Sequence, residues 1–281
     1  MEHQDSVHLV ASQLVKEFTR YGTTLVLFSA GVDSSVVLAA AVRALGVARV
    51  AAVTAASPAV PAAELAAARS FCDGLGVPHH VVHTDELDVA GYRDNGPRRC
   101  YFCKSTLVDA ARELADRHGY ETLVTGTNAS DVRAGFRPGI RAAGERGART
   151  PLADLGLDKS QVRAIARRWG LATAEKPAAA CLSSRIAFGI PISPARLARV
   201  ERAELTVRQL LAAQGVVDLR VRDLGDAVRV EVDGGLVERV RADERVAAAI
   251  RAAGFGTAPL TVEAFRSGAM NELLPDAARW R

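Results

Sequence analysis

The chain has 281 residues, of which 49% are hydrophobic, and a formal net charge of +4. This length suits one large or two modest domains with a packed core, and the mild charge is typical of a solvated surface rather than of a nucleic-acid footprint. No segment approaches the roughly 18–20 uninterrupted apolar residues of a membrane span, and residues 1–20 lack a signal-peptide pattern, so we expect a soluble, cytoplasmic protein without membrane contact.

The first half of the chain alternates between predicted helices and predicted strands. Short, mostly apolar runs indicate buried strands, and longer runs with a 3.6-residue period indicate helices, which glycines end. In chain order we predict a helix over 7–20, a strand over 24–28, a helix over 34–45, a strand over 47–53, a helix over 62–75, a strand over 78–83, a helix over 106–118 and a strand over 122–125. The alternation predicts an α/β fold, an open parallel sheet with flanking helices.

Residues 131–150 break this pattern, because they are rich in Gly and Arg and have no clear apolar period. We predict a mobile loop near a ligand there, then a helix over 159–169 and an irregular stretch over 172–193. After Pro194 the predicted parts are a helix over 195–213, a hairpin of strands 219–223 and 227–233, a helix over 236–253 and a strand over 260–265. We therefore expect a nucleotide-binding domain over 1–190 and a small α+β domain for substrate binding or oligomerisation over 191–281.

The strongest local signal is the segment Ser29-Ala30-Gly31-Val32-Asp33-Ser34-Ser35, between the first predicted strand and the next helix. At such a junction backbone N–H groups and the positive end of a helix dipole face one point, and small residues let a phosphate approach. Asp33 indicates either bound Mg²⁺ or an N-capping role. An ordinary strand–helix turn is the alternative, since the segment is neither a Walker A sequence nor a G-x-G-x-x-G motif.

Three of the four cysteines lie in segments that point to chemistry. Cys100 and Cys103 form a C-x-x-C motif, which alone indicates a redox pair, a zinc half-site or iron–sulfur ligands. Cys181 lies in an irregular stretch, whereas the apolar helical pattern around Cys72 predicts a buried structural thiol. Three thiolates without a fourth suit a [4Fe–4S] cluster with one open iron, which can hold an extra sulfide or a substrate atom.

The segment 29–35 resembles the PP-loop signature, S-G-G-x-D-S, of ATP-pyrophosphatases, which cleave ATP between the α and β phosphates and attach AMP to a substrate oxygen. The resemblance implies that this segment binds ATP phosphates and Mg²⁺, that Gly126 and Thr127 border the nucleotide, and that Arg137 lies in a loop facing the phosphates. Ala30 stands where the family usually has glycine. If this position needs a positive φ, alanine there is strained by about 1 kcal/mol.

Several motifs in order resemble the LarE family, the ATP-dependent sulfur transferases that help to make the nickel-pincer nucleotide cofactor. They are S-A-G-V-D-S-S, R-C-x-x-C-K, T-G-T-N-x-x-D, R-P-G, K-P-x-x-x-C-L-S-S-R and the segment 266–272. The resemblance implies a pyridinium mononucleotide substrate. Its carboxylate receives AMP, and sulfur then replaces AMP to leave a thiocarboxylate.

The LarE family has two variants, and the cysteines decide between them. In one, a single cysteine at the position of Cys181 gives up its own sulfur; in the other, three cysteines hold a cluster. Cys100, Cys103 and Cys181 resemble the second variant, which implies that they ligate a [4Fe–4S] cluster and deliver sulfur, with Asp33 as the Mg²⁺ ligand. On the substrate side the resemblance indicates Ser184, Arg185, Arg220, Arg222 and Glu231. An ordinary exposed β-ribbon is the alternative for the last three.

Two other functions remain open at this point. A tRNA-thiolating PP-loop enzyme can also use three cysteines, but the chain has no dense Lys/Arg run, which disfavours a nucleic-acid partner. A non-catalytic adenine-nucleotide sensor would explain the segment 29–35 but would give the three cysteines no function. The family resemblance also implies a ring-like homo-oligomer, and the sequence does not indicate which donor recharges the protein with sulfur.

Overall fold

The computed structural model describes residues 2–177 and 180–274, and these form two compact units. Within the described residues, unit 1 comprises 2–86 and 100–177, and unit 2 comprises 87–99 and 180–274. The chain thus enters unit 2 twice, first through the short segment 87–99. This division by compactness differs from the functional division expected at residue 190, which stays a prediction.

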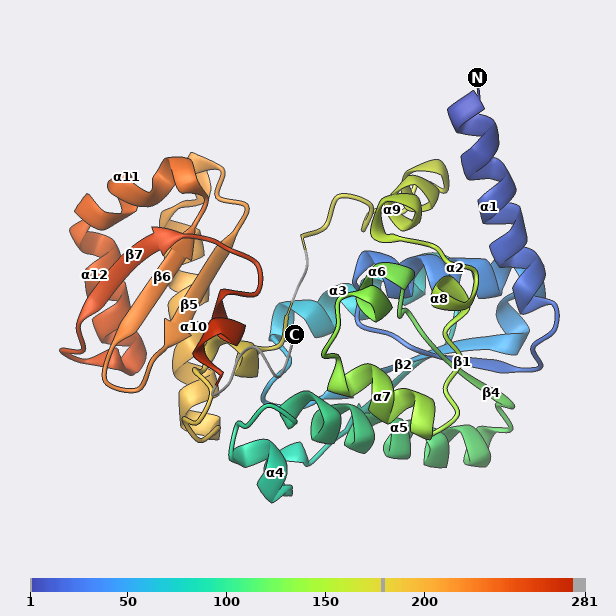
Figure 1. The fold of residues 1–281 in the computed structure, drawn as a ribbon, viewed down its shortest axis with the longest axis horizontal. Helices are drawn as coiled ribbons and strands as arrows, with labels where there is room; N and C mark the ends of the chain where they lie inside the picture. Colours follow the sequence, from blue (N-terminus) through green and yellow to red (C-terminus); the bar gives the residue numbers. More distant parts are fainter. Residues whose placement is uncertain (1, 178–179, 275–281) are drawn as a thin grey trace. The chain divides into compact units, whose positions relative to one another are not determined.

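Unit 1 is built on a parallel sheet (Figure 1). Its strands are β1 (Thr24–Leu27), β2 (Val50–Ala56), β3 (His79–His83) and β4 (Thr122–Thr125), in the order β3-β2-β1-β4. Every pair is parallel, with Thr24 opposite both Val50 and Thr122. The predicted open parallel sheet is therefore confirmed. Since β1 lies between β2 and β4, its carboxyl end stands beside theirs at one edge.

Helices flank this sheet on both faces. In chain order they are α1 (Glu2–Phe18), α2 (Val32–Leu45), the 3-10 turn η1 (Val47–Arg49), α3 (Ala62–Leu75), α5 (Arg99–His118), α6 (Ala129–Arg133), α7 (Pro138–Glu145), α8 (Pro151–Asp154) and α9 (Lys159–Arg168). Glycines end α2 and α3, with positive φ at Gly46 and Gly76, as the sequence predicts.

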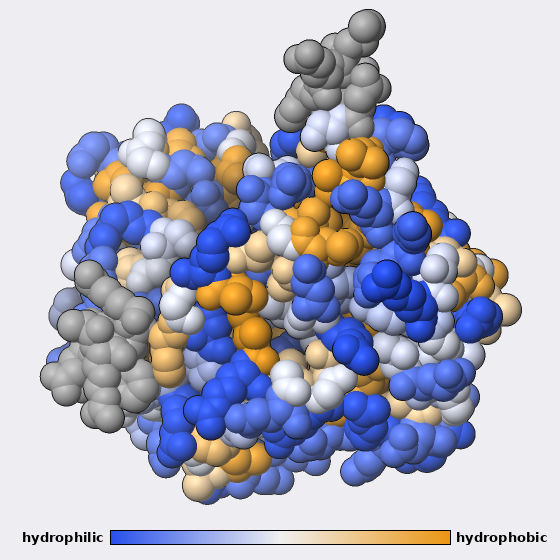
Figure 2. Space-filling view, turned by 45° about the vertical axis from the view of Figure 1, so that its right-hand side comes forward, coloured by the Kyte–Doolittle hydropathy of each residue, from blue (hydrophilic) through white to orange (hydrophobic). Residues whose placement is uncertain are grey.

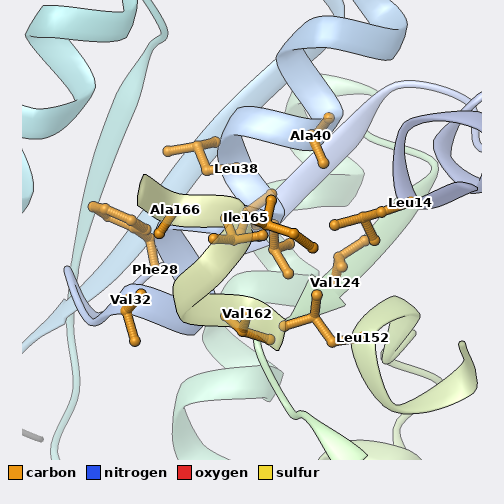
Figure 3. Packing of buried hydrophobic residues seen from close by; sticks show 14 of the residues in the cluster. Leu14, Phe28, Val32, Leu38, Ala40, Val124, Leu152, Val162, Ile165 and Ala166 are labelled. Atoms are coloured by element: carbon orange, nitrogen blue, oxygen red, sulfur yellow. The ribbon is translucent and has the colours of Figure 1, made fainter. Parts of the chain in front are cut away.

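Alternate residues of the strands enter two separate cores, as the pleat requires. On one face Val26 and Phe28 pack with α1, α2, α3 and α9, and Figure 3 shows Leu14, Val124 and Ile165 gathered in this cluster. On the other face Leu25 and Leu27 pack with α5 and α7. Strands β1, β2 and β4 are therefore mostly buried on both faces, which explains their apolar runs, whereas the edge strand β3 is only half-buried.

The prediction of an irregular loop over 131–150 is wrong, because α6 and α7 occupy most of it. The side chain of Asn128 accepts from the N–H of Asp131 at 3.0 Å, and Asp131 returns the bond in a capping box that starts α6. Pro138 takes the first position of α7, where its missing N–H costs nothing. These caps outweigh the weak apolar period.

Helix α5 and the helices after residue 236 also differ from the prediction. Helix α5 begins at Arg99 rather than at 106, which places the C-x-x-C motif in its first turn. The single helix predicted over 236–253 is broken at Asp243, whose side chain accepts from the N–H of Arg245 at 3.0 Å and starts a second helix.

Unit 2 has its own three-stranded sheet of β5 (Leu219–Asp223), β6 (Val228–Val232) and β7 (Leu260–Ala264). The predicted hairpin is confirmed, since β5 and β6 are antiparallel, whereas β6 and β7 are parallel. The remaining elements are η2 (Glu86–Asp88), α4 (Ala90–Arg93), η3 (Leu182–Arg185), α10 (Pro194–Leu210), η4 (Ala212–Gln214), η5 (Gly234–Leu236), α11 (Val237–Ala242), α12 (Glu244–Ile250), the π-helical turn η6 (Arg251–Phe255) and η7 (Ala269–Leu273).

Helix α10 packs along β5 and is tied to it by charge. Arg196 and Arg199 both donate to the carboxylate of Asp223, at 2.9 Å and 3.1 Å, and this carboxylate is fully buried. A buried charge is costly unless it is paired, and the two guanidinium groups supply the partners that this carboxylate needs.

None of the helices in the described residues is long and apolar enough to cross a membrane. On the face that Figure 2 displays, hydrophobic residues occur in separate groups among polar ones.

Candidate functional site

The segment 29–35 leaves the carboxyl end of β1 and enters α2, as predicted. Gly31 is the N-cap residue, with φ −84° and ψ 161°, and no side chain caps the helix there. The first N–H groups of an α-helix have no partner within the helix, so those of α2 face outward at the sheet edge with the positive end of the helix dipole. This arrangement is suited to an anion.

Ala30 has φ 53°, which is the left-handed region, and its side chain is buried. Glycine adopts this region freely, whereas alanine is disfavoured there by about 1 kcal/mol. The strain that we considered for a positive φ at this position is therefore present in the chain. A strained non-glycine residue persists only when its surroundings hold it.

The three serines of the loop have different surroundings. The Ser34 hydroxyl donates to the carbonyl of Gly31 at 3.1 Å and accepts from the N–H of Ser29 at 3.3 Å, so it shapes the loop. Ser35 is fully buried, and its hydroxyl has no hydrogen-bond partner within the described chain. Ser29 is exposed, and the Val32 side chain belongs to the core. Among these side chains, only that of Ser29 is open to solvent for a ligand.

Gly126 follows β4 and touches the first turn of α2. A Cβ atom at this position would lie 2.7 Å from the backbone nitrogen of Ser34, which is closer than real Cβ atoms approach. Only glycine fits without a shift. The neighbouring Thr127 has its hydroxyl 3.0 Å from that of Thr125, and its carbonyl accepts from the N–H of Ala153 at 3.2 Å. The loop after β4 is thus fixed against the segment 29–35.

Asp33 is not the N-cap, so the capping alternative is wrong. Its carboxylate accepts from the side-chain amide of Asn128 at 3.1 Å and from the ammonium of Lys159, which forms an ion pair with it. The carboxylate therefore lies at the open end of α2 with a cation already beside it. Lys159 was missed from the sequence, although Asp158 and Gln161 form a capping box that marks the start of α9 around it.

Arg137 is the N-cap residue of α7, not part of an irregular loop. Its guanidinium lies 3.8 Å from the carboxylate of Asp131, and both side chains are largely exposed. A Cβ atom on Gly139 would lie 3.3 Å from the carbonyl oxygen of Cys100, so the first turns of α7 and α5 are in contact. Arg137 thus belongs to the surroundings of α5 as well as to those of Asn128.

Cys100 and Cys103 lie three residues apart in the first turn of α5, on one face of that helix. Cys100 is exposed and Cys103 is half-buried. Burial lowers the pKa of the adjacent Lys104, while the thiols of Cys103 and Cys100 act in the opposite direction. Cys72 is fully buried in α3, and burial raises its pKa to about 12, with Asp73 adding to the shift. The predicted burial of this thiol is confirmed.

Cys181 belongs to unit 2 and precedes the 3-10 turn η3. Its carbonyl accepts from the Ser184 hydroxyl at 2.7 Å and from Arg185 at 3.1 Å. Arg99, which directly precedes Cys100 in the sequence, donates to the carbonyl of Ser183 at 2.9 Å. The 3-10 turn after Cys181 is therefore held by side chains as well as by its backbone hydrogen bonds.

The substrate-side residues predicted on β5 and β6 are buried, so the alternative of an exposed ribbon is wrong. Arg220, Arg222 and Glu231 are 8%, 6% and 1% exposed. Arg222 donates to Glu231 at 2.7 Å and to the carbonyl of Ser184 at 3.1 Å, and Arg185 pairs with Glu204 at 2.9 Å. Arg222 and Arg185 are thus each paired with a carboxylate.

Arg220 differs from the other two arginines of this group. Its guanidinium lies over the ring of Phe265, 5.2 Å from the centroid, and donates to the carbonyl of Leu219 at 2.7 Å. Burial lowers its pKa, and repulsion from Arg185 contributes to the shift. The nearby carboxylates of Glu204 and Asp218 act in the opposite direction.

The predicted metal ligands are divided between the units, Cys100 and Cys103 in unit 1 and Cys181 in unit 2. Within residues 2–177 and 180–274, no three His, Cys, Asp or Glu side chains are grouped as metal ligands. A hollow of about 300 Å³ lies elsewhere, between α1 and α9. Since none of the predicted site residues lines it, it carries no part of the proposed chemistry.

Comparison with known proteins gives the following similarities. A family model described as asparagine synthase matches residues 8–151. An uncharacterised protein of Synechocystis sp. is 37% identical over 260 residues, which are 92% of this chain and 95% of the relative. The pyridinium-3,5-bisthiocarboxylic acid mononucleotide synthase of Lactiplantibacillus plantarum is 31% identical over 253 residues, 90% of either chain. An uncharacterised protein of Methanocaldococcus jannaschii is 28% identical over 173 residues, 62% of this chain and 66% of the relative.

Proposed function

The chain belongs to the LarE family within the PP-loop superfamily, and from this premise we propose that it is an ATP-dependent sulfur transferase. Its substrate would be a pyridinium mononucleotide that bears a carboxylate. The observation that carries the proposal is the uncapped start of α2 with the Asp33 carboxylate beside it, in a chain that also has Cys181 next to buried arginines.

The first half of the reaction uses the phosphate loop. Backbone N–H groups at the start of α2 bind ATP phosphates, and Asp33 binds Mg²⁺ together with those phosphates. Before nucleotide binds, Lys159 neutralises the charge of Asp33. The carboxylate therefore does not repel the incoming phosphates. The substrate carboxylate oxygen attacks the α phosphorus, the bond to the β-phosphate oxygen breaks, and pyrophosphate leaves.

Adenylation solves a chemical problem of the substrate. A carboxylate is a poor electrophile because its oxygen is a poor leaving group, whereas AMP carries that oxygen away. Sulfur then adds to the carbonyl carbon, AMP departs, and a thiocarboxylate remains. Cationic groups stabilise the oxyanion that develops between these two events.

The buried arginines of unit 2 suit the anionic substrate. We assign Arg185, Arg220 and Arg222 to its phosphate or carboxylate groups, since guanidinium groups bind such anions through two parallel hydrogen bonds. Glu231 orients Arg222, and Ser184 fixes the carbonyl of Cys181. Arg220 is the member of this group whose guanidinium lies over an aromatic ring, that of Phe265.

Sulfur delivery is assigned to the three cysteines. Cys100 and Cys103 fit one metal centre, because the i, i+3 spacing on α5 turns both thiols to the same side and Cys100 is exposed. When bound by three cysteines, a [4Fe–4S] cluster supplies an open iron that can hold sulfide. Cys181 is the third proposed ligand, and Ser184 and Arg185 hold its backbone.

The test combines product analysis with metal analysis of protein purified without oxygen. Given ATP, Mg²⁺ and a pyridinium carboxylate mononucleotide, the protein should release pyrophosphate and AMP and form a thiocarboxylate. Cys181→Ser should keep pyrophosphate release and lose the thiocarboxylate, because only the second half needs sulfur. Cys72→Ala is the matched control, and it should keep sulfur transfer within a few-fold, since Cys72 is buried in α3.

The outcomes separate the alternatives. About four iron atoms per chain, lost on changing Cys100, Cys103 and Cys181 to serine, support the cluster. No iron after reconstitution makes Cys181 a sacrificial donor and contradicts the cluster. Pyrophosphate release with tRNA but not with the mononucleotide points to a tRNA-thiolating enzyme, and no release with either substrate leaves only a nucleotide sensor.

A further inference from the structure

Lys176 stands beside the phosphate loop without a role in the reaction described above. Its ammonium donates to the carbonyl of Ala30 at 3.0 Å and to the carboxylate of Glu64 on α3 at 2.6 Å. Both side chains are 23% exposed, so water screens this group only in part. The contact reaches the one loop residue that has a left-handed backbone without being glycine.

The direction of the Ala30 carbonyl determines the direction of the next N–H group. A peptide unit is planar and trans, so the C=O of Ala30 and the N–H of Gly31 point in opposite directions. Rotation of Ala30 to its preferred negative φ would turn this unit and withdraw the N–H from the loop. A donor that holds the carbonyl therefore also holds the N–H.

The backbone of Lys176 is itself anchored. Arg163 of α9 donates to the carbonyl of Ala174 at 2.6 Å and to that of Lys176 at 3.1 Å. Lys176 is thus fixed through its backbone to α9 and through its side chain to α3 and the loop. Three elements that are distant in sequence converge on one strained peptide.

We propose that Lys176 is a positioning residue of the nucleotide site, which holds the Ala30–Gly31 peptide in the orientation that binds ATP phosphates, and that Glu64 orients Lys176. The inference rests on the proposed function, because it assumes that the loop binds ATP. The side chain of Lys176 contacts the backbone of the loop at Ala30. Its loss is therefore expected to act through the conformation of Ala30.

The test measures the Kd of Mg²⁺ and a non-hydrolysable ATP analogue by calorimetry. Lys176→Met should raise the Kd by about tenfold, and Lys176→Arg should recover part of the loss, because a guanidinium can still donate to the carbonyl. Glu64→Gln should raise the Kd by about threefold. Lys16→Met, on the exposed side of α1, is the matched control and should leave the Kd unchanged.

The decisive variant is Ala30→Gly, because glycine adopts the positive φ without strain. In this background Lys176→Met should raise the Kd by no more than about twofold, since the loop no longer needs the same support. If Lys176→Met fails to fold, Glu64→Gln with and without Ala30→Gly gives the same comparison. An undiminished loss in the glycine background would overturn the proposal, and so would a lower melting temperature with an unchanged Kd. A wild-type protein that binds no ATP would instead refute the proposed function.

Discussion

At the scale of single residues, the negative charge of Asp33 is balanced by neighbouring side chains. A carboxylate at an anion-binding helix terminus would repel phosphates, but here it has an ammonium and an amide as partners. The pair with Lys159 is partly exposed, so its contribution to stability is small. In the proposed function, this pair presents a carboxylate that Mg²⁺ would bind when the nucleotide brings its own negative charge.

We expect Asp33→Asn to lower pyrophosphate release by at least about 100-fold, because the amide keeps the shape of the side chain and loses the metal ligand. The melting temperature should stay within about 2 °C, since the ion pair that is lost is weak. Asp109→Asn removes another partly exposed carboxylate that is paired with an arginine and is the control. Full activity of the Asp33 variant would contradict the assignment of Asp33 as a Mg²⁺ ligand.

At the scale of elements, the site depends on how closely β4 approaches α2. The loop after β4 touches the first turn of α2 at Gly126, and this contact presses two backbones together without a side chain between them. The start of α2 is therefore positioned by the sheet rather than by a capping side chain. A change in this contact should affect both nucleotide binding and the stability of the fold.

Gly126→Ala tests this dependence. The added Cβ would lie 2.7 Å from the backbone of Ser34, so we expect a loss of about 2 kcal/mol in the free energy of unfolding and weaker ATP binding. Gly144 of α7 has no atom within 4 Å of an added Cβ, and Gly144→Ala should raise stability by about 0.5–1 kcal/mol. Chemical denaturation measures both. Equal stability of the two variants would show that the contact at Gly126 is not tight.

Elements with a strong apolar pattern could be predicted from the sequence, and those that depend on caps without such a pattern could not. The helix over 62–75 was predicted with its observed bounds, because an apolar stripe ends at a glycine. Helices α6 and α7 were missed, since they depend on Asn128, Asp131 and Pro138 rather than on a period. The break at Asp243 has the same cause.

The candidate site shows the same limit. The loop 29–35 was found because its residues are adjacent in sequence and follow an apolar strand. Lys159 and Lys176 are 126 and 146 residues from their partners in the loop, and a single lysine has no local pattern. The burial of Arg220, Arg222 and Glu231 was equally invisible, because alternating charged residues on a hairpin predict a solvated face.

At the scale of the whole molecule, the stability of unit 1 should depend on pH through His79. Thr54 donates its hydroxyl to the carbonyl of Phe28 at 2.8 Å, so the ring nitrogen Nε2 of His79, 2.8 Å away, donates to Thr54. The other ring nitrogen is buried without a partner in the described residues. Burial lowers the pKa of His79, and the charge of Arg69 adds to this, while Asp73 opposes it.

The folded state therefore binds fewer protons than the unfolded state below the ordinary histidine pKa of about 6.5. The stabilisation is complete above that pH and is lost as the pH falls towards the lowered pKa. His79→Gln, whose amide can still donate to Thr54, should flatten this part of the profile of unfolding free energy between pH 7 and pH 5. The exposed His83 lies on the same face of β3, and His83→Gln should leave the profile unchanged. Parallel profiles for His79→Gln and wild type would contradict the neutral tautomer.

The segment 87–99 belongs to unit 2 although it precedes much of unit 1, and this order matters for synthesis on the ribosome. Asn95 donates to carbonyl groups of Ile186, Ala187 and Ile190, which come 91, 92 and 95 residues later. At about 5–20 residues per second, the segment 87–99 waits roughly 5–20 s for these partners. Unit 2 can therefore close only after the strands of unit 1 have been made, so its first segment waits without its partners while unit 1 is synthesised.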